Sequence, residues 1–201
     1  MTASRHLQLW LIMLLVAGCS GLDQRGPASS SWQSHNAQLE LLQQWTAIGK
    51  VALRTAKASE SASLAWQQDN RNTYLHLSGP LGMGATTIHS NGRELEIYRD
   101  DNHTTVDISN PDAIVLNTGF DLPLNALSYW LKGIPAPAIK VQRLELDPQT
   151  ELLQSLWQND WEVSYQRYEQ FQGFTLPTRL QIQRRETRAK IIISNWQTSP
   201  K

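Results

Sequence analysis

The side chains that could act as metal ligands, nucleophiles or general bases are spread along the chain without a spacing that would bring them together. No two histidines show the His-x-x-x-His spacing that places two metal ligands on one helix face. No serine lies in a Gly-x-Ser-x-Gly turn, and Gly82-Met83-Gly84 lacks the strand–turn–helix context of a phosphate-binding loop. The sequence therefore predicts no metal site, no cofactor and no enzyme. The histidines that follow residue 6 are His35, His76, His89 and His103.

Two clusters of charged residues are better explained as exposed turns than as reactive groups. Asp100 and Asp101 would form a candidate carboxylate pair, but they lie between two predicted strands, where a solvated turn is the ordinary outcome. A basic run at 184–188 falls in a predicted hairpin in the same way. Over the whole chain 18 Lys and Arg balance 18 Asp and Glu, so the basic excess that phosphate-backbone binding needs is missing. We expect no nucleic-acid partner.

The single cysteine lies at the end of a secretory signal. Arg5 and His6 precede a continuous apolar run over residues 9–17, which is much shorter than the roughly 20 residues of a membrane-spanning helix. The run ends in Val16-Ala17-Gly18-Cys19, which resembles the bacterial lipobox, whose cysteine becomes the first mature residue and carries acyl chains. We therefore predict a signal peptide over residues 1–18 and lipidation of Cys19. The alternative is an ordinary cleavage site with an incidental cysteine.

Lipidation at Cys19 predicts an anchored protein whose body lies outside the bilayer. Each buried methylene contributes about 0.8 kcal/mol, so a multiply acylated cysteine holds the chain at a membrane without a spanning helix. Ser20 follows the cysteine, whereas lipoproteins retained in the inner membrane of Gram-negative bacteria typically carry aspartate there. This favours the outer membrane. The Gly-, Ser- and Pro-containing segment over residues 19–31 predicts a flexible tether.

Residues 32–201 are predicted to form a single domain built mainly of strands. Apolar residues spaced by three and four between Trp32 and Leu42 indicate an amphipathic helix. Period-two alternation follows over residues 45–53, broken on the polar face only by Ile48. Shorter strands are expected around residues 62–66, 74–78, 85–89, 95–97 and 106–108, then 152–157, 161–165, 180–182 and 191–196. Asn91-Gly92 is the strongest hairpin signal among the turns between them.

Two helices are expected between the strands. Asn110 and Pro111 offer a cap and a first turn for a short helix that ends near Gly119. A second helix has Asp121 as its expected cap, carries Leu124, Leu127 and Leu131 on one face, and ends at Gly133 and Pro135. The fold class is thus mainly β with inserted helices: an incomplete, unclosed antiparallel β-barrel of about ten or eleven strands with a helical lid. A curled sheet of this kind encloses either side chains or a ligand.

A loop between two predicted strands has an unusual composition. Gly79-Pro80-Leu81-Gly82-Met83-Gly84 contains turn residues, yet its tip carries Leu81 and Met83 where Asn, Asp or Ser would be usual. Leu81 either folds back onto the core or forms an apolar wedge that touches a bilayer or an acyl chain. The residues alone leave both interpretations open.

Several stretches together resemble the LolB family of outer-membrane lipoprotein receptors of Gram-negative bacteria. They are the lipobox at Cys19, the strand–Gly-Pro-Leu-Gly–strand segment, the run from Leu122 to Pro135, and the closing Ile193-Ser194-Asn195-Trp196. The resemblance covers essentially the whole chain. It implies a hydrophobic cavity under a helical lid and an exposed leucine that inserts lipoproteins into the membrane; Leu81 is the residue that matches. Gly79, Pro80, Gly82 and Met83 complete the insertion loop, and no separate role follows for Met83.

The resemblance also implies the partners and the location. The receptor would accept triacylated lipoproteins from a soluble LolA-like periplasmic carrier and release them into the inner leaflet of the outer membrane. It would act as a monomer on the periplasmic face, anchored through Cys19. Expected lining residues of the acyl-chain cavity are Trp45, Val51, Leu53, Leu64, Trp66, Leu127, Trp130 and Leu131.

Three other classes remain open from the residues. A structural outer-membrane lipoprotein would share the anchor but fill its core completely. A barrel-type lipid-modifying hydrolase would need a nucleophile and a base, which the sequence does not display. A binder of another lipid, including lipopolysaccharide, would use the same kind of cavity.

Overall fold

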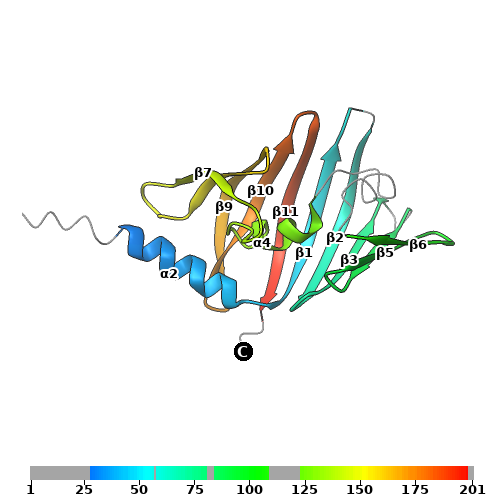
Figure 1. Cartoon of the computed structure of the whole chain (residues 1–201), viewed down its shortest axis with the longest axis horizontal. Helices are drawn as coiled ribbons and strands as arrows, with labels where there is room; N and C mark the ends of the chain where they lie inside the picture. Colours follow the sequence, from blue (N-terminus) through cyan, green and yellow to red (C-terminus); the bar gives the residue numbers. More distant parts are fainter. Residues whose placement is uncertain (1–27, 57, 81–83, 109–122, 199–201) are drawn as a thin grey trace, which may run out of the picture.

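A single antiparallel sheet of eleven strands forms the body of the protein. The computed structural model describes residues 28–56, 58–80, 84–108 and 123–198. The strands follow the order β6-β5-β4-β3-β2-β1-β11-β10-β9-β8-β7, so β6 and β7 are the two edges and the sheet does not close. The predicted unclosed antiparallel fold is confirmed (Figure 1). The strands are β1 (Gln44–Arg54), β2 (Ser59–Asp69), β3 (Asn72–Ser78), β4 (Thr86–Ser90), β5 (Glu94–Arg99), β6 (Asn102–Asp107), β7 (Val141–Leu146), β8 (Leu153–Gln158), β9 (Trp161–Phe171), β10 (Phe174–Arg184) and β11 (Thr187–Thr198).

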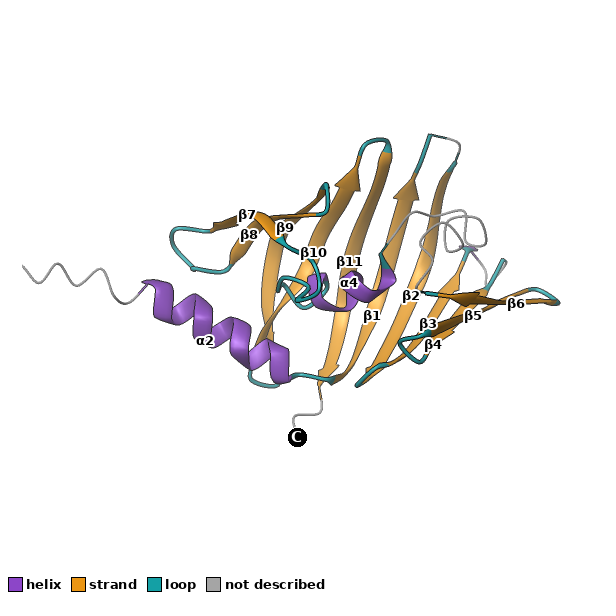
Figure 2. Cartoon of the chain, viewed as in Figure 1, coloured by secondary structure: helices purple, strands orange, loops and turns teal. Residues whose placement is uncertain are grey.

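Two helices lie on one face of this sheet, which curls around them (Figure 2). Helix α2 covers Ala28–Leu41 and α4 covers Leu124–Trp130. Helix α2 begins four residues before Trp32, so its first turn falls within the range predicted as a tether. Its buried residues lie at its C-terminal end, where Leu39 is fully buried and Leu42 follows it into the core. Within the described residues, no helix has the length and apolar character to span a membrane.

The alternation of inward and outward residues predicted for β1 is present in the structure. Trp45 and Ala47 are buried on the inner face, whereas Ile48 on the other face is 41% exposed. Because successive strand residues point to opposite sides of a sheet, Val51 and Leu53 belong to the inner face and Lys50 and Arg54 to the outer face.

A β-bulge keeps the inward-facing residues of the two long central strands, β1 and β11, on the same face of the sheet. The register of β1 with β11 shifts between Ile48, which faces Asn195, and Gly49, which faces Ile193. Ser194 is the extra residue, and its hydroxyl donates a hydrogen bond to the carbonyl of Ile48 at 3.0 Å. The insertion returns Trp196 to the inner face, where it is buried. A Cβ at residue 49 would lie 2.0 Å from the carbonyl oxygen of Ile192, so only glycine fits there.

Two local signals of the sequence are found as expected. Asn91 and Gly92 join β4 to β5; Gly92 has a φ of 85°, and the Asn91 side chain accepts hydrogen bonds from the backbone N–H groups of Arg93 and Glu94. Gly133, with a φ of 83°, follows the end of α4. Its N–H donates a hydrogen bond to the carbonyl of Trp130, and the N–H of Ile134 donates one to the carbonyl of Tyr129.

Other elements differ from expectation or lie outside the described part. Strand β7 was not predicted, because it is an edge strand that pairs only with β8 and its first three residues are exposed. The short helix expected near 110–116 falls among residues that the structure does not describe. So does Asp121, the expected cap of the second helix; that helix begins at Leu124 with Pro123 as its N-cap.

Candidate functional site

An apolar pocket lies between the inner face of the sheet and α4. Its volume is about 470 Å³, within the usual range for binding sites of small ligands. Strands β1 to β5 and β11 form its walls, and Leu124 and Leu127 of α4 cover it. The lining residues are Val51, Leu53, Glu60, Ser61, Ala62, Leu64, Trp66, Leu75, Leu77, Gly79, Pro80, Gly84, Thr86, Ile88, Ile97, Arg99, Leu124, Leu127, Ala189 and Ile191.

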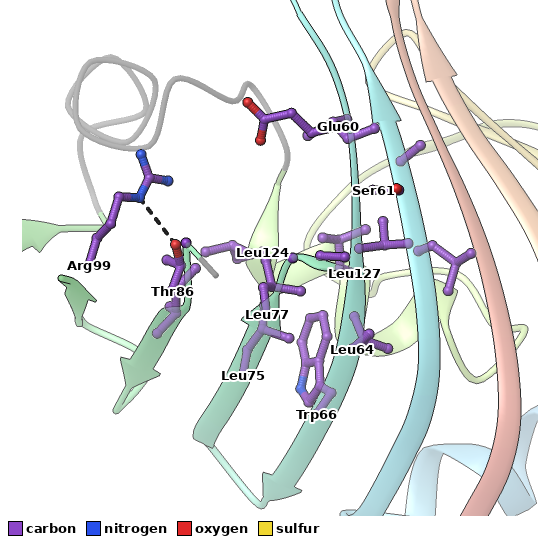
Figure 3. Close-up of a pocket in the computed structure, with 18 of the residues that line it drawn as sticks. Glu60, Ser61, Leu64, Trp66, Leu75, Leu77, Thr86, Arg99, Leu124 and Leu127 are labelled. Carbon is purple, nitrogen blue, oxygen red and sulfur yellow. Dashed lines mark hydrogen bonds between the residues drawn. The ribbon is translucent and has the colours of Figure 1, made fainter. Parts of the chain in front are cut away.

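The polar side chains of this pocket are confined to its margin (Figure 3). Trp66 lies at one end, and Glu60 and Ser61 lie towards the other. Arg99, the one lining residue that carries a positive charge, donates a hydrogen bond from Nε to the hydroxyl of Thr86 at 3.1 Å. The remaining wall is aliphatic and aromatic, so the pocket suits a ligand with a long apolar part and a polar group near the opening.

Five of the eight predicted cavity residues line this pocket. Val51, Leu53, Leu64 and Trp66 come from β1 and β2, and Leu127 comes from α4. Each had been placed on an inner face by period two or by helical spacing, and the curl of the sheet brings these faces together.

The other three predicted cavity residues lie in the packed core and do not line the pocket. Trp45 is surrounded by aromatic rings, with Trp66 at 5.9 Å and Trp196 at 5.2 Å between centroids. Trp130 and Leu131 are fully buried at the end of α4. Periodicity assigned them to the correct face, but the neighbours that fill the space around them come from distant strands.

The insertion loop is described only at its ends. Gly79, Pro80 and Gly84 line the pocket, which places the base of the loop at the margin of the site. Leu81, Gly82 and Met83 lie outside the described residues.

Several lining residues that the sequence analysis did not select come from strands that it predicted. Leu75 and Leu77 of β3, Ile88 of β4 and Ile97 of β5 all belong to inner faces, and their alternation with polar residues was the available signal. Arg99 had no such signal, because a basic residue at the end of a strand is ordinary on any surface.

A buried glutamine fixes the position of α4 over the pocket. Gln158 of β8 is fully buried, and its Oε1 accepts hydrogen bonds from Trp130 Nε1 at 2.8 Å and from the Ala136 N–H at 2.9 Å. Its Nε2 donates to the carbonyls of Ala136 and Ile139. The amide is thus fully satisfied and joins the helix and the segment after it to the far half of the sheet.

A buried lysine joins the two helices. Lys132 follows α4, and its Nζ donates hydrogen bonds to the carbonyls of Leu39 and Leu42 at 2.8 and 2.9 Å, at the C-terminal end of α2. Burial lowers the pKa of this ammonium to about 8, and Glu40 opposes the shift. A cation at a helix C-terminus also interacts favourably with the helix dipole.

In the described ranges there is no group of three or more His, Cys, Asp or Glu side chains arranged to hold a metal ion. The candidate site is the hydrophobic pocket under α4.

The family model described as "Outer membrane lipoprotein LolB" matches residues 43–196, which include α4 and all the strands except the last two residues of β11. The chain belongs to the LolB family. It is 34% identical over 200 residues to a LolB of Ectopseudomonas mendocina, with 96% of each chain covered. It is 31% identical over 205 residues to a LolB of Stutzerimonas stutzeri, covering 98% of this chain and 97% of the other.

Solved structures share the fold at low sequence identity. A LolA superfamily protein from Nitrosomonas europaea has a TM-score of 0.51 at 12% identity, with 84% of this chain and 93% of that chain covered. A putative outer membrane lipoprotein-sorting protein domain from Vibrio parahaemolyticus has a TM-score of 0.53 at 8% identity, covering 86% and 91%. These likenesses concern the fold alone.

Membership of the LolB family settles the general function. The chain is an outer-membrane lipoprotein of the lipoprotein-localisation pathway that faces the periplasm. It is a receptor that accepts lipoproteins from LolA, and it is not an enzyme.

Proposed function

We propose that the pocket under α4 holds the acyl chains of triacylated lipoproteins between their release from the LolA-like carrier and their insertion into the inner leaflet of the outer membrane. The observation that carries this proposal is the aliphatic lining of the pocket, with polar side chains only at its margin. An acyl chain left in water would lose about 0.8 kcal/mol for each methylene, so transfer between two proteins requires a cavity on each side.

The direction of transfer follows from relative affinity. A receptor can draw cargo from a carrier only if it holds the acyl chains more tightly, and the bilayer must hold them more tightly still. The pocket provides apolar contact without a charged residue at its closed end, where Trp66 lies. Transfer down such a gradient needs no nucleotide.

The loop and the anchor have separate tasks in this proposal. Leu81 inserts into the bilayer as an apolar wedge beside the pocket margin formed by Gly79, Pro80 and Gly84. The lipid on Cys19 holds the receptor at the outer membrane. The protein acts as a monomer, because one chain carries the complete pocket and its lid.

A transfer assay tests the receptor function. The unlipidated body, residues 20–201, is mixed with carrier-bound triacylated lipoprotein, and a pull-down shows which protein holds the cargo. We expect the cargo to move onto this protein without ATP. Absence of transfer to a folded protein would favour a structural lipoprotein or a binder of another lipid.

A substitution that fills the pocket tests its role directly. Ala62 of β2 lines the pocket, whereas Ala65 of the same strand is exposed on the outer face. We expect Ala62→Phe to abolish cargo uptake and Ala65→Phe to leave uptake unchanged, with both variants folded by circular dichroism. Equal uptake by the two variants would mean that the acyl chains bind elsewhere.

A further inference from the structure

The three adjacent strands β1, β11 and β10 carry charge of one sign only. None of their residues is aspartate or glutamate, although the whole chain has equal numbers of acidic and basic residues. Five exposed basic residues lie on the outer face of these strands, opposite the pocket. We call them the basic face: Lys50, Arg54, Arg179, Arg188 and Lys190.

The strand register brings these five residues into one compact patch. Arg54 faces Arg188 directly, and Lys190 is two residues further along the same strand. In the next row Ile192 lies between Lys50 on one side and Arg179 on the other. With strands about 4.8 Å apart and successive outward residues about 7 Å apart, Arg54, Arg188 and Lys190 are spaced within a Debye length of about 8 Å, and Lys50 and Arg179 lie only slightly further from Lys190.

This arrangement is unfavourable for the isolated fold. Like charges directly opposite each other on paired strands are destabilising. The ion pairs Arg143–Glu145 and Arg167–Glu169 do not include a residue of the basic face, although Arg167 faces Arg179 across the β9–β10 pair. The acidic side chains nearest to it in the described strands and turns lie at its borders. Glu60 of β2 faces Leu53, Glu186 lies in the turn between β10 and β11, and Glu162 of β9 faces Gln183. Among the described residues no acidic side chain forms an ion pair with the basic face, so this patch is suited to an anionic partner outside the fold.

The partner that fits best is the surface of the membrane to which this lipoprotein is attached. Anionic phospholipid headgroups attract Lys and Arg side chains held near the surface. Two apolar residues, Ile48 and Ile192, are exposed at 41% and 39% on the same outer face, and they would lie among the headgroups. On β2, Ser59 and Ser63 extend the face with small hydroxyl groups opposite Arg54 and Lys50.

The carrier has to reach a different surface of the receptor from the basic face. It delivers acyl chains to the pocket, which opens on the inner side of the sheet, whereas the basic face lies on the opposite side of β1 and β11. A receptor that rests on the bilayer through its outer face leaves the inner side of the sheet free for the carrier.

We propose that the basic face is a docking surface for anionic phospholipid headgroups that orients the receptor on the outer membrane. The proposal rests on the membrane attachment given above, and it adds a third membrane contact to the anchor and the loop. It assigns the outer face of β1, β10 and β11 to the membrane and leaves cargo binding to the inner face.

Lysine reactivity tests this orientation in the full mature lipoprotein. The protein is added from detergent to vesicles of phosphatidylcholine, or to vesicles in which part of it is replaced by phosphatidylglycerol, and amine labelling is followed by mass spectrometry. We expect labelling of Lys50 and Lys190 to slow about threefold or more with phosphatidylglycerol, and the protection to disappear at high salt. Lys140, which is exposed but outside the basic face, is the internal control.

Two double variants test whether the slower lysine labelling depends on the basic face. Arg54→Gln with Arg188→Gln should abolish the slower labelling of the two lysines, whereas Arg71→Gln with Arg93→Gln, at exposed positions outside the patch, should preserve it. Equal labelling in the two kinds of vesicle, or equal protection of Lys140, would overturn the proposal. Protection that appears only when carrier is added to neutral vesicles would assign the face to the carrier and would also overturn it. Cargo uptake, read separately by pull-down, shows whether the receptor function itself holds.

Discussion

Two polar side chains, Gln158 and Lys132, determine where the lid helix lies. Both are almost completely buried, and both use their hydrogen bonds on backbone groups distant in sequence or on the Trp130 indole. A buried polar group costs free energy unless it is satisfied, so each side chain stabilises only the arrangement in which its partners are in place. Neither side chain lines the pocket, and both hold the segment around the helix that covers it.

The buried ammonium of Lys132 predicts an alkaline dependence of stability. Its pKa of about 8 in the folded protein lies below the ordinary value of 10.5, so the unfolded chain binds more protons between these two pH values. The free energy of unfolding should therefore rise with pH across this window, by up to about 3 kcal/mol relative to Lys132→Met. Urea denaturation of both proteins at several pH values measures it. A difference between the two proteins that does not change with pH would contradict the shifted pKa.

Replacing the leucine at the loop tip should separate uptake from insertion. We expect Leu81→Glu to fold and to take up cargo normally but to fail to insert lipoprotein into vesicles, because a carboxylate does not enter the hydrocarbon region. Leu81→Met should retain insertion. A large loss of thermal stability in Leu81→Glu would instead show that the side chain belongs to the core.

At the scale of the strands, one irregularity, the bulge between β1 and β11, determines which residues of β11 face inward. Without the extra residue Ser194, the residues after it would exchange faces, and Trp196 would leave the aromatic cluster around Trp45. The bulge therefore allows β11 to contribute Ile191 to the pocket and Trp196 to the core.

The close approach at the bulge predicts a strongly destabilising substitution. In Gly49→Ala the new Cβ would clash with the carbonyl oxygen of Ile192 at 2.0 Å, which only a backbone shift relieves. We expect a loss of about 3 kcal/mol in the free energy of unfolding. Ala52→Ser, at an exposed position of the same strand, is the control and should change stability by less than about 0.5 kcal/mol. Similar denaturation midpoints for both variants would show that the strands are free to separate here.

The elements themselves could mostly be predicted from local sequence. The alternation in β1, the turn at Asn91-Gly92 and the end of α4 at Gly133 are local signals that involve residues close in the chain. Strand β7 could not be predicted, because a half-exposed edge strand has no buried face to produce a pattern.

For the whole molecule, the open sheet leaves two free edges that must not pair with other chains. Strands β6 and β7 are each only six residues long, and Arg143 and Glu145 place charges on β7. Short, charged edge strands resist edge-to-edge association. The open architecture that admits a long apolar ligand is thus compatible with a single chain.

These edges predict that the protein body remains monomeric. Light scattering coupled to size-exclusion chromatography of residues 20–201 should give the mass of one chain at all accessible concentrations. Replacing both charges of β7, in Arg143→Val with Glu145→Val, should promote association by creating an apolar edge. A stable dimer of the unaltered protein would contradict the proposed monomer.

The sequence by itself determined the class of fold and the family, because period-two alternation, turn residues and family motifs are properties of neighbouring positions. It also assigned Val51, Leu53, Leu64 and Trp66 to inner faces. Only the tertiary structure decided which inner-facing side chains line the pocket and which fill the core, as Trp45 and Trp130 do. That distinction depends on how far the sheet curls and on where Gln158 and Lys132 hold α4. The hydrogen bonds of these two side chains join residues far apart in the chain, so local sequence does not reveal them.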